Sequence, residues 1–118
     1  MTETNDRKPA FARLVRLVTE RGLPDVTQSA VDGAPALAIG DTPFAIIHDP
    51  VTLVLACPRH QKVLLMDISP DLYFETEQHV GRDTMLIDLG RIADEELSLR
   101  LHDAWEYVAP DRLKRDVD

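Results

Sequence analysis

Cys57 is the residue most open to a catalytic role, because a cysteine at the start of a helix can act as a nucleophile. It precedes Pro58 at a predicted helix start, where the helix dipole lowers the pKa of a thiol. Arg59 and His60 follow directly and would favour the thiolate further. The alternative is a buried cysteine at a strand end, which packs as a small hydrophobic residue. A nucleophile needs an orienting base, and the sequence identifies none, so we favour the buried role.

The histidines and acidic residues do not form a pattern typical of a metal or acid–base site. The histidines are scattered, without metal-ligand spacing to a cysteine or carboxylate, at His48, His60, His79 and His102. Glu75 and Glu77 would share one face of a strand, but we interpret them, with Asp83, as solvated surface acids. The phosphate-binding patterns GxxxxGK[ST] and GxGxxG are absent. We therefore expect no metal, no cofactor and no enzymatic activity.

The charge of the chain disfavours binding of nucleic acid over the whole surface. The formal net charge is −8, from 21 acidic and 13 basic residues, whereas nucleic-acid binders usually present a basic field. No Lys or Arg lies between Arg21 and Arg59, an interval that holds Asp25, Asp32, Asp41 and Asp49. The bases gather near both ends, at Arg7, Lys8, Arg13, Arg16 and Arg21, and at Arg112, Lys114 and Arg115. These two groups could meet as one patch, although solvated helix surface is the more common outcome.

Apolar periodicity and turn residues predict three helices and an antiparallel sheet. The predicted order is a helix over 9–21, strands over 26–31, 35–39, 44–48 and 51–56, a helix from Pro58, strands over 72–77 and 84–89, and a helix capped by Asp94. Its core stripe comprises Leu97, Leu101, Ala104, Trp105 and Val108. The strand over 26–31 alternates poorly and is expected to pair weakly. The predicted class is α+β, a two-layer fold with the helices on one face of the sheet.

The length of 118 residues predicts one domain over 9–113, with a disordered N-terminal tail over 1–8 and a C-terminal tail over 114–118. No stretch approaches the roughly 20 apolar residues of a membrane helix, so we expect no membrane partner. The N-terminus is polar and lacks a signal-peptide core, and the lone cysteine cannot form an internal disulfide. A cytoplasmic location is expected.

Several short motifs, in order and spacing, resemble the MmcQ/YjbR family of small bacterial proteins. They occupy residues 21–26, 33–37, 44–45, 57–58, Lys62, 73–76, Gly81, 96–97, 104–105 and 109–110. The resemblance implies a helix, three strands, a helix, two strands and a helix, similar to bacterial secretion chaperones. It also implies DNA binding through a double-wing arrangement of β-hairpins. This chain departs from the family at Thr42, where a lysine is usual, and at Gln78, where a histidine is common.

Two binding functions follow. DNA binding is implied by the family resemblance, and its carriers here would be Arg13, Arg16, Lys62 and Arg82. The alternative is a protein- or peptide-binding, chaperone-like module whose acidic surface takes a basic or amphipathic partner, docked on a sheet edge. His79 and Tyr107 are the predicted partner-surface residues.

Overall fold

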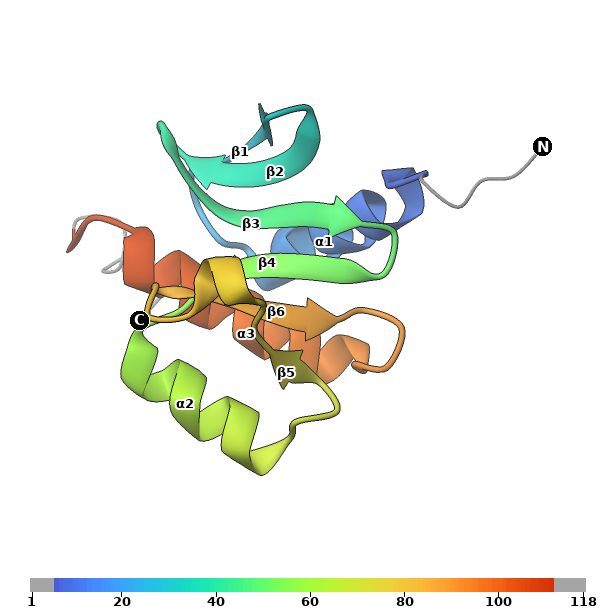
Figure 1. Ribbon diagram of the computed structural model, residues 1–118. Helices are drawn as coiled ribbons and strands as arrows, with labels where there is room; N and C mark the ends of the chain where they lie inside the picture. Colours follow the sequence, from blue (N-terminus) through green and yellow to red (C-terminus); the bar gives the residue numbers. More distant parts are fainter. Residues whose placement is uncertain (1–5, 112–118) are drawn as a thin grey trace.

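A computed structural model describes residues 6–111, which form three α-helices and a six-stranded antiparallel sheet (Figure 1). The predicted α+β class is therefore confirmed. The elements in chain order are α1 (Lys8–Arg21), β1 (Val26–Val31), β2 (Ala34–Ile39), β3 (Thr42–Asp49), β4 (Thr52–Ala56), α2 (Arg59–Ile68), β5 (Tyr73–Phe74), a 3₁₀ turn (Glu77–His79), β6 (Thr84–Asp88) and α3 (Asp94–Val108). The predicted tail over 114–118, the domain boundary at 113 and residues 1–5 lie outside the described residues.

The sheet has the strand order β1-β2-β3-β4-β6-β5, so β1 and β5 form its two edges. The first four strands follow one another as antiparallel neighbours, as their short connections predict. The register of β2 with β3 shifts by one residue: Leu37 pairs with Ala45, but the next residue, Ala38, pairs with Pro43. Phe44 is therefore an extra, unpaired residue of β3, which is a β-bulge. This bulge places Phe44 in the core, with 1% of its surface exposed.

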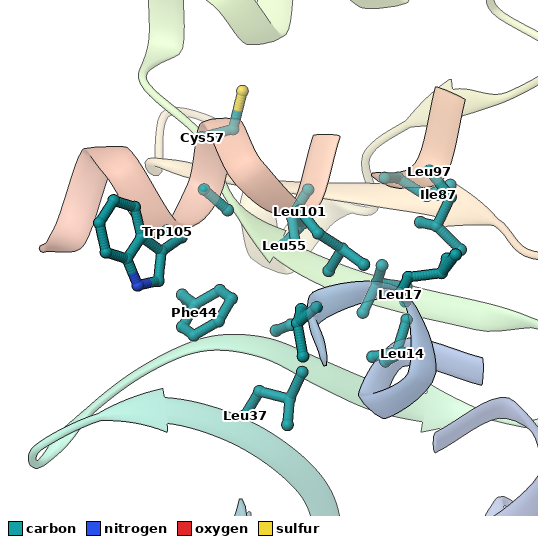
Figure 2. Packing of buried hydrophobic residues seen from close by; sticks show 14 of the residues in the cluster. Leu14, Leu17, Leu37, Phe44, Leu55, Cys57, Ile87, Leu97, Leu101 and Trp105 are labelled. Atoms are coloured by element: carbon teal, nitrogen blue, oxygen red, sulfur yellow. The ribbon is translucent and has the colours of Figure 1, made fainter. Parts of the chain in front are cut away.

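The core lies between the sheet and two of the helices. α1 and α3 lie behind the sheet, whereas α2 lies beyond the β5 edge (Figure 1), so the prediction that the helices share one face is wrong for α2. Four of the five residues of the predicted α3 stripe are buried and Val108 is partly buried, and Trp105 lies beside Phe44 (Figure 2). The Trp105 indole donates a hydrogen bond to the Pro24 carbonyl at 3.0 Å, which satisfies its one polar atom. Within residues 6–111, no helix combines the length and the apolar character that crossing a membrane requires.

The starts of α2 and α3 differ from the predicted ones. Pro58 is the N-cap of α2, not its first helical residue. Asp94 is the first residue of α3 and does not cap it, since Ala93 occupies the N-cap position and no side chain caps the helix. The Asp94 carboxylate instead faces two arginines of α1, because two charge-assisted hydrogen bonds, one from each arginine, compete well against one capping bond.

The strand predicted over 72–77 is shorter than expected. β5 spans only Tyr73–Phe74, and the chain then turns into the 3₁₀ segment Glu77–His79. Glu75 leaves the strand to pair with the Lys62 ammonium, with 2.5 Å between Oε1 and Nζ. Glu75 and Glu77 therefore do not share a strand face, and the paired-carboxylate pattern considered above does not form.

Candidate binding groove beside an edge strand

Cys57 is a buried structural cysteine. Only 4% of the surface of this residue is exposed. Its sulfur points away from the surrounding apolar side chains, towards α2 (Figure 2). Burial, and then the Asp103 charge, raise the pKa of the thiol to about 11, so the thiolate is disfavoured. The Sγ atom lies 3.9 Å from Oε1 of Gln61, an amide that cannot act as a base. This geometry matches the favoured role of Cys57 and gives no support to a nucleophile.

Arg13 and Arg16, two of the cations considered for DNA, bind within the protein. Arg13 donates to Asp94 Oδ1 at 2.8 Å and to the carbonyls of Leu89 and Ile92 at 2.7 and 2.6 Å. Arg16 donates to Asp94 Oδ2 at 2.9 Å. The two arginines, Arg16 first, hold the pKa of Asp94 below its usual range. These contacts tie α1 to the start of α3, so phosphate would have to compete with a carboxylate for both side chains.

The other two predicted DNA cations lie at the α2 edge. Lys62 is 2% exposed, and its ammonium binds Glu75 and the carbonyls of His79 and Arg82, at 2.7 and 3.1 Å for the carbonyls. Arg82 is exposed, and its side chain forms no hydrogen bond or ion pair with residues 6–111. The basic group comprising Arg112, Lys114 and Arg115 lies outside the described residues. Of the four candidates, Arg82 is thus the only one whose charge is exposed without a hydrogen bond or ion pair in the described chain.

The two predicted partner-surface residues, His79 and Tyr107, each form a side-chain hydrogen bond to a residue of the segment 83–84. The His79 ring nitrogen Nδ1 lies 2.7 Å from the Thr84 hydroxyl. Burial, and then the Lys62 charge, lower the pKa of His79. Tyr107 is 43% exposed, and its hydroxyl donates to Asp83 Oδ2 at 2.7 Å. That bond raises the pKa of Tyr107. Their role towards a partner stays a prediction.

β1 is an edge strand, and no strand within residues 6–111 pairs with its outer side. Four of its six residues are exposed. Outside the pairing with β2, no backbone hydrogen bond connects residues 26–31 to the rest of the described chain. Edge strands are usually protected by charge, proline, a bulge or shortness. β1 has the sequence VTQSAV and an unbroken register with β2, and so carries none of these devices.

The opposite edge is protected. β5 has two residues, and α2 contacts it on the side away from the meander (Figure 1). A strand of two residues offers few backbone groups to a partner. The asymmetry makes β1 the edge that can accept another strand.

A groove runs between α1 and β1 and consists of two adjoining hollows. We call it the α1–β1 groove. One hollow has a volume of about 360 Å³ and is lined by Val15, Val18, Thr19, Gly22, Leu23, Val26, Gln28 and Leu37. The other has a volume of about 430 Å³ and is lined by Lys8, Phe11, Ala12, Val15, Arg16, Gln28 and Pro35. They share Val15 and Gln28, and most of their lining is apolar.

The groove follows from how the chain turns between α1 and β1. Gly22 ends α1 with φ of 71°, a left-handed conformation that glycine adopts without steric cost. The chain returns through Pro24 into β1, so helix and strand run alongside each other in opposite directions. Side chains on the groove face of β1 are Val26 and Gln28, and by alternation Ala30. The sequence predicted α1 and β1 but not the groove, although the poor apolar alternation of 26–31 was a signal of a strand with an uncovered side.

Comparisons of this chain with models of protein families, with curated proteins and with solved structures give no match.

Proposed function

We propose that this protein is a non-enzymatic binding module that holds an extended polypeptide segment as an added strand on β1. The observation that carries the proposal is the open, unprotected edge of β1 beside an apolar groove. Strand addition obtains affinity from main-chain hydrogen bonds and specificity from pockets for alternate side chains. Both parts are present at this one place in the fold.

The charge of the β1–β4 meander favours a basic segment, while the two cations that line the groove, Lys8 and Arg16, belong to α1, and Arg16 is paired with Asp94 and Glu20. Residues 22–58, which include the whole β1–β4 meander, contain four aspartates and no Lys or Arg. A segment that carries lysines or arginines is therefore attracted to this half of the molecule, and an acidic one is repelled.

A second copy of the chain is the other strand that an open edge could accept, and its charge opposes that pairing. Each copy has a formal net charge of −8. An antiparallel pair of β1 strands aligned over all six residues would place Asp25 of each copy opposite Asp32 of the other. Like charges directly opposite each other destabilise a strand pair. A separate, basic segment fits the edge better.

The resemblance to the MmcQ/YjbR family stays a prediction; it implies three strands between the first two helices, and the structure has four there. DNA binding, which that resemblance implies, needs cations on the hairpins. The hairpins of β1–β4 carry none, and three of the four predicted DNA cations are engaged within the protein. We therefore favour the peptide-binding function over the DNA-binding one.

The test is amide hydrogen exchange, measured by NMR for residues 26–31, with a capped octapeptide of alternating valine and lysine. Saturating peptide is expected to slow exchange of the β1 amides that face outwards, because added hydrogen bonds protect them. Unchanged exchange throughout 26–31 at saturation would overturn the proposal.

Two methylated peptides serve as matched controls. One carries N-methyl groups on its valines and the other on its lysines, so each removes one alternate set of N–H donors. Only one set can face β1, and only that peptide is expected to lose binding. Equal binding by all three peptides would show that no strand forms. A DNA duplex at about 50 mM salt is the competing ligand, and shifts that centre on Arg82 rather than β1 would favour DNA.

A further inference from the structure

The α1–β1 groove is divided into two hollows by Gln28, and this division sets a spacing for the ligand. Val26 and Gln28 line the groove, and Ala30 follows on the same face by alternation, paired with Pro35, which lines the second hollow. Paired residues on neighbouring strands point to the same face, so three alternate residues of an added strand face the groove. The outer two, opposite Val26 and Ala30, lie over different hollows, and the middle one lies opposite Gln28.

Resting on the proposed function, we infer that the groove recognises a segment with two apolar side chains four residues apart, a polar residue midway and basic residues at both ends. The apolar residues enter the two hollows, whose walls include Leu23 and Leu37 in one and Phe11 and Pro35 in the other.

Gln28 specifies the middle position. Its side chain is exposed at the boundary of both hollows, and its amide has no hydrogen-bond partner within residues 6–111. A primary amide offers two donors and one acceptor, so it pairs well with a hydroxyl or amide side chain. An apolar residue at that position would desolvate the amide without replacing its hydrogen bonds to water.

The ends of β1 specify the flanking bases. Asp25 directly precedes the strand and Asp32 directly follows it, so acidic residues stand at both ends of a strand about 20 Å long. The wider meander, residues 22–58, holds four aspartates and no base, so its field attracts cations along the whole edge. Lysine or arginine at both ends is therefore preferred.

The probe is a capped heptapeptide that reads the same in both directions: lysine, leucine, serine, threonine, serine, leucine, lysine. Its symmetry makes the result independent of whether the added strand is parallel or antiparallel to β1. The matched control exchanges the second leucine with the preceding serine, which keeps the composition and turns that leucine to the other face. Binding of the control, measured by fluorescence anisotropy, is expected to be weaker by about tenfold or more.

Three tryptophan variants test the hollows separately. Thr19→Trp fills the hollow lined by Leu23 and Leu37, and Ala12→Trp fills the hollow lined by Phe11 and Pro35, each from an exposed position of α1. Each variant is expected to lower the affinity for the probe by about tenfold. Val63→Trp, at a position of α2 that is 62% exposed, is the matched control and is expected to leave affinity unchanged. Circular dichroism checks that all three stay folded.

The outcomes separate the two proposals. Equal affinity for both heptapeptides, with slowed exchange of the β1 amides, would overturn the spacing and leave strand addition intact. If all three tryptophan variants lowered the affinity for the probe equally, the two hollows would not be the sites that recognise its leucines. Absence of β1 protection with either heptapeptide would overturn both the spacing and the proposed function.

Discussion

At the scale of single residues, the structure decides between two roles for Cys57. The sequence placed this cysteine before a helix, where a dipole lowers a thiol pKa. In the structure the residue is buried, and desolvation outweighs the lowering by the Arg100 and Lys62 charges, so the pKa rises to about 11. Sequence spacing gives the position of a residue relative to a helix end, but not its depth, which is why the pKa could not be predicted.

The raised pKa predicts slow alkylation of the folded protein. At pH 8 a thiol of pKa about 11, against the ordinary 9.0, has about 100-fold less thiolate. Iodoacetamide is therefore expected to modify native Cys57 at least about 100-fold more slowly than the urea-unfolded chain, since burial adds to the effect. Mass spectrometry of quenched time points measures both rates. Comparable rates would show that the thiol is exposed or activated in the folded protein.

At the scale of elements, the sequence predicted what local patterns determine. The helix over 9–21, the antiparallel order of the first four strands and most of the core stripe of α3 follow from local patterns, and the structure agrees. Contacts between distant segments were not predictable. The Asp94 carboxylate pairs with the arginines of α1 and does not cap its own helix. Glu75, which was predicted to lie in a strand, pairs with Lys62 instead. The groove, likewise, exists only because α1 and β1 return alongside each other.

Lys62 holds α2 against the segment 75–82, so its removal should destabilise this whole edge. Lys62→Met keeps the length of the side chain but leaves the Glu75 carboxylate and the carbonyls of His79 and Arg82 without their donor. Breaking one partner of a buried pair costs about 3–5 kcal/mol, and we expect an effect of about 3 kcal/mol because Glu75 retains some exposure. Urea denaturation followed by circular dichroism measures the free energy of unfolding.

The double variant Lys62→Met/Glu75→Gln is the control for that experiment. It removes the carboxylate charge that Lys62→Met leaves without a partner, so part of the lost free energy of unfolding is expected to return. If the single and double variants were equally unstable, the loss would come from the two carbonyls and not from the ion pair. If Lys62→Met matched the wild type, Lys62 would not be the buried anchor that the structure shows.

At the scale of the whole molecule, the uneven distribution of charge bears on how a partner arrives. The chain has a net charge of −8, and residues 22–58 supply −4 of it, from four aspartates and no base. That region includes β1, the proposed binding edge. Fields of this kind accelerate the encounter with an opposite charge and weaken with ionic strength, because the Debye length falls from about 30 Å at 0.01 M salt to about 10 Å at 0.1 M.

The association rate of a lysine-containing peptide should therefore fall with salt, while its dissociation rate changes little. Between about 10 and 100 mM salt we expect a decrease of about threefold to tenfold in the association rate constant, measured by stopped-flow fluorescence of the labelled heptapeptide. The same peptide with glutamine in place of both lysines keeps the apolar spacing and removes the charge, so its association rate should be nearly independent of salt. Equal salt dependence of the two peptides would show that the acidic half of the molecule does not steer binding. A salt effect confined to the dissociation rate would place the lysines in close ion pairs instead, since mutating rim charges changes association whereas breaking buried pairs changes dissociation.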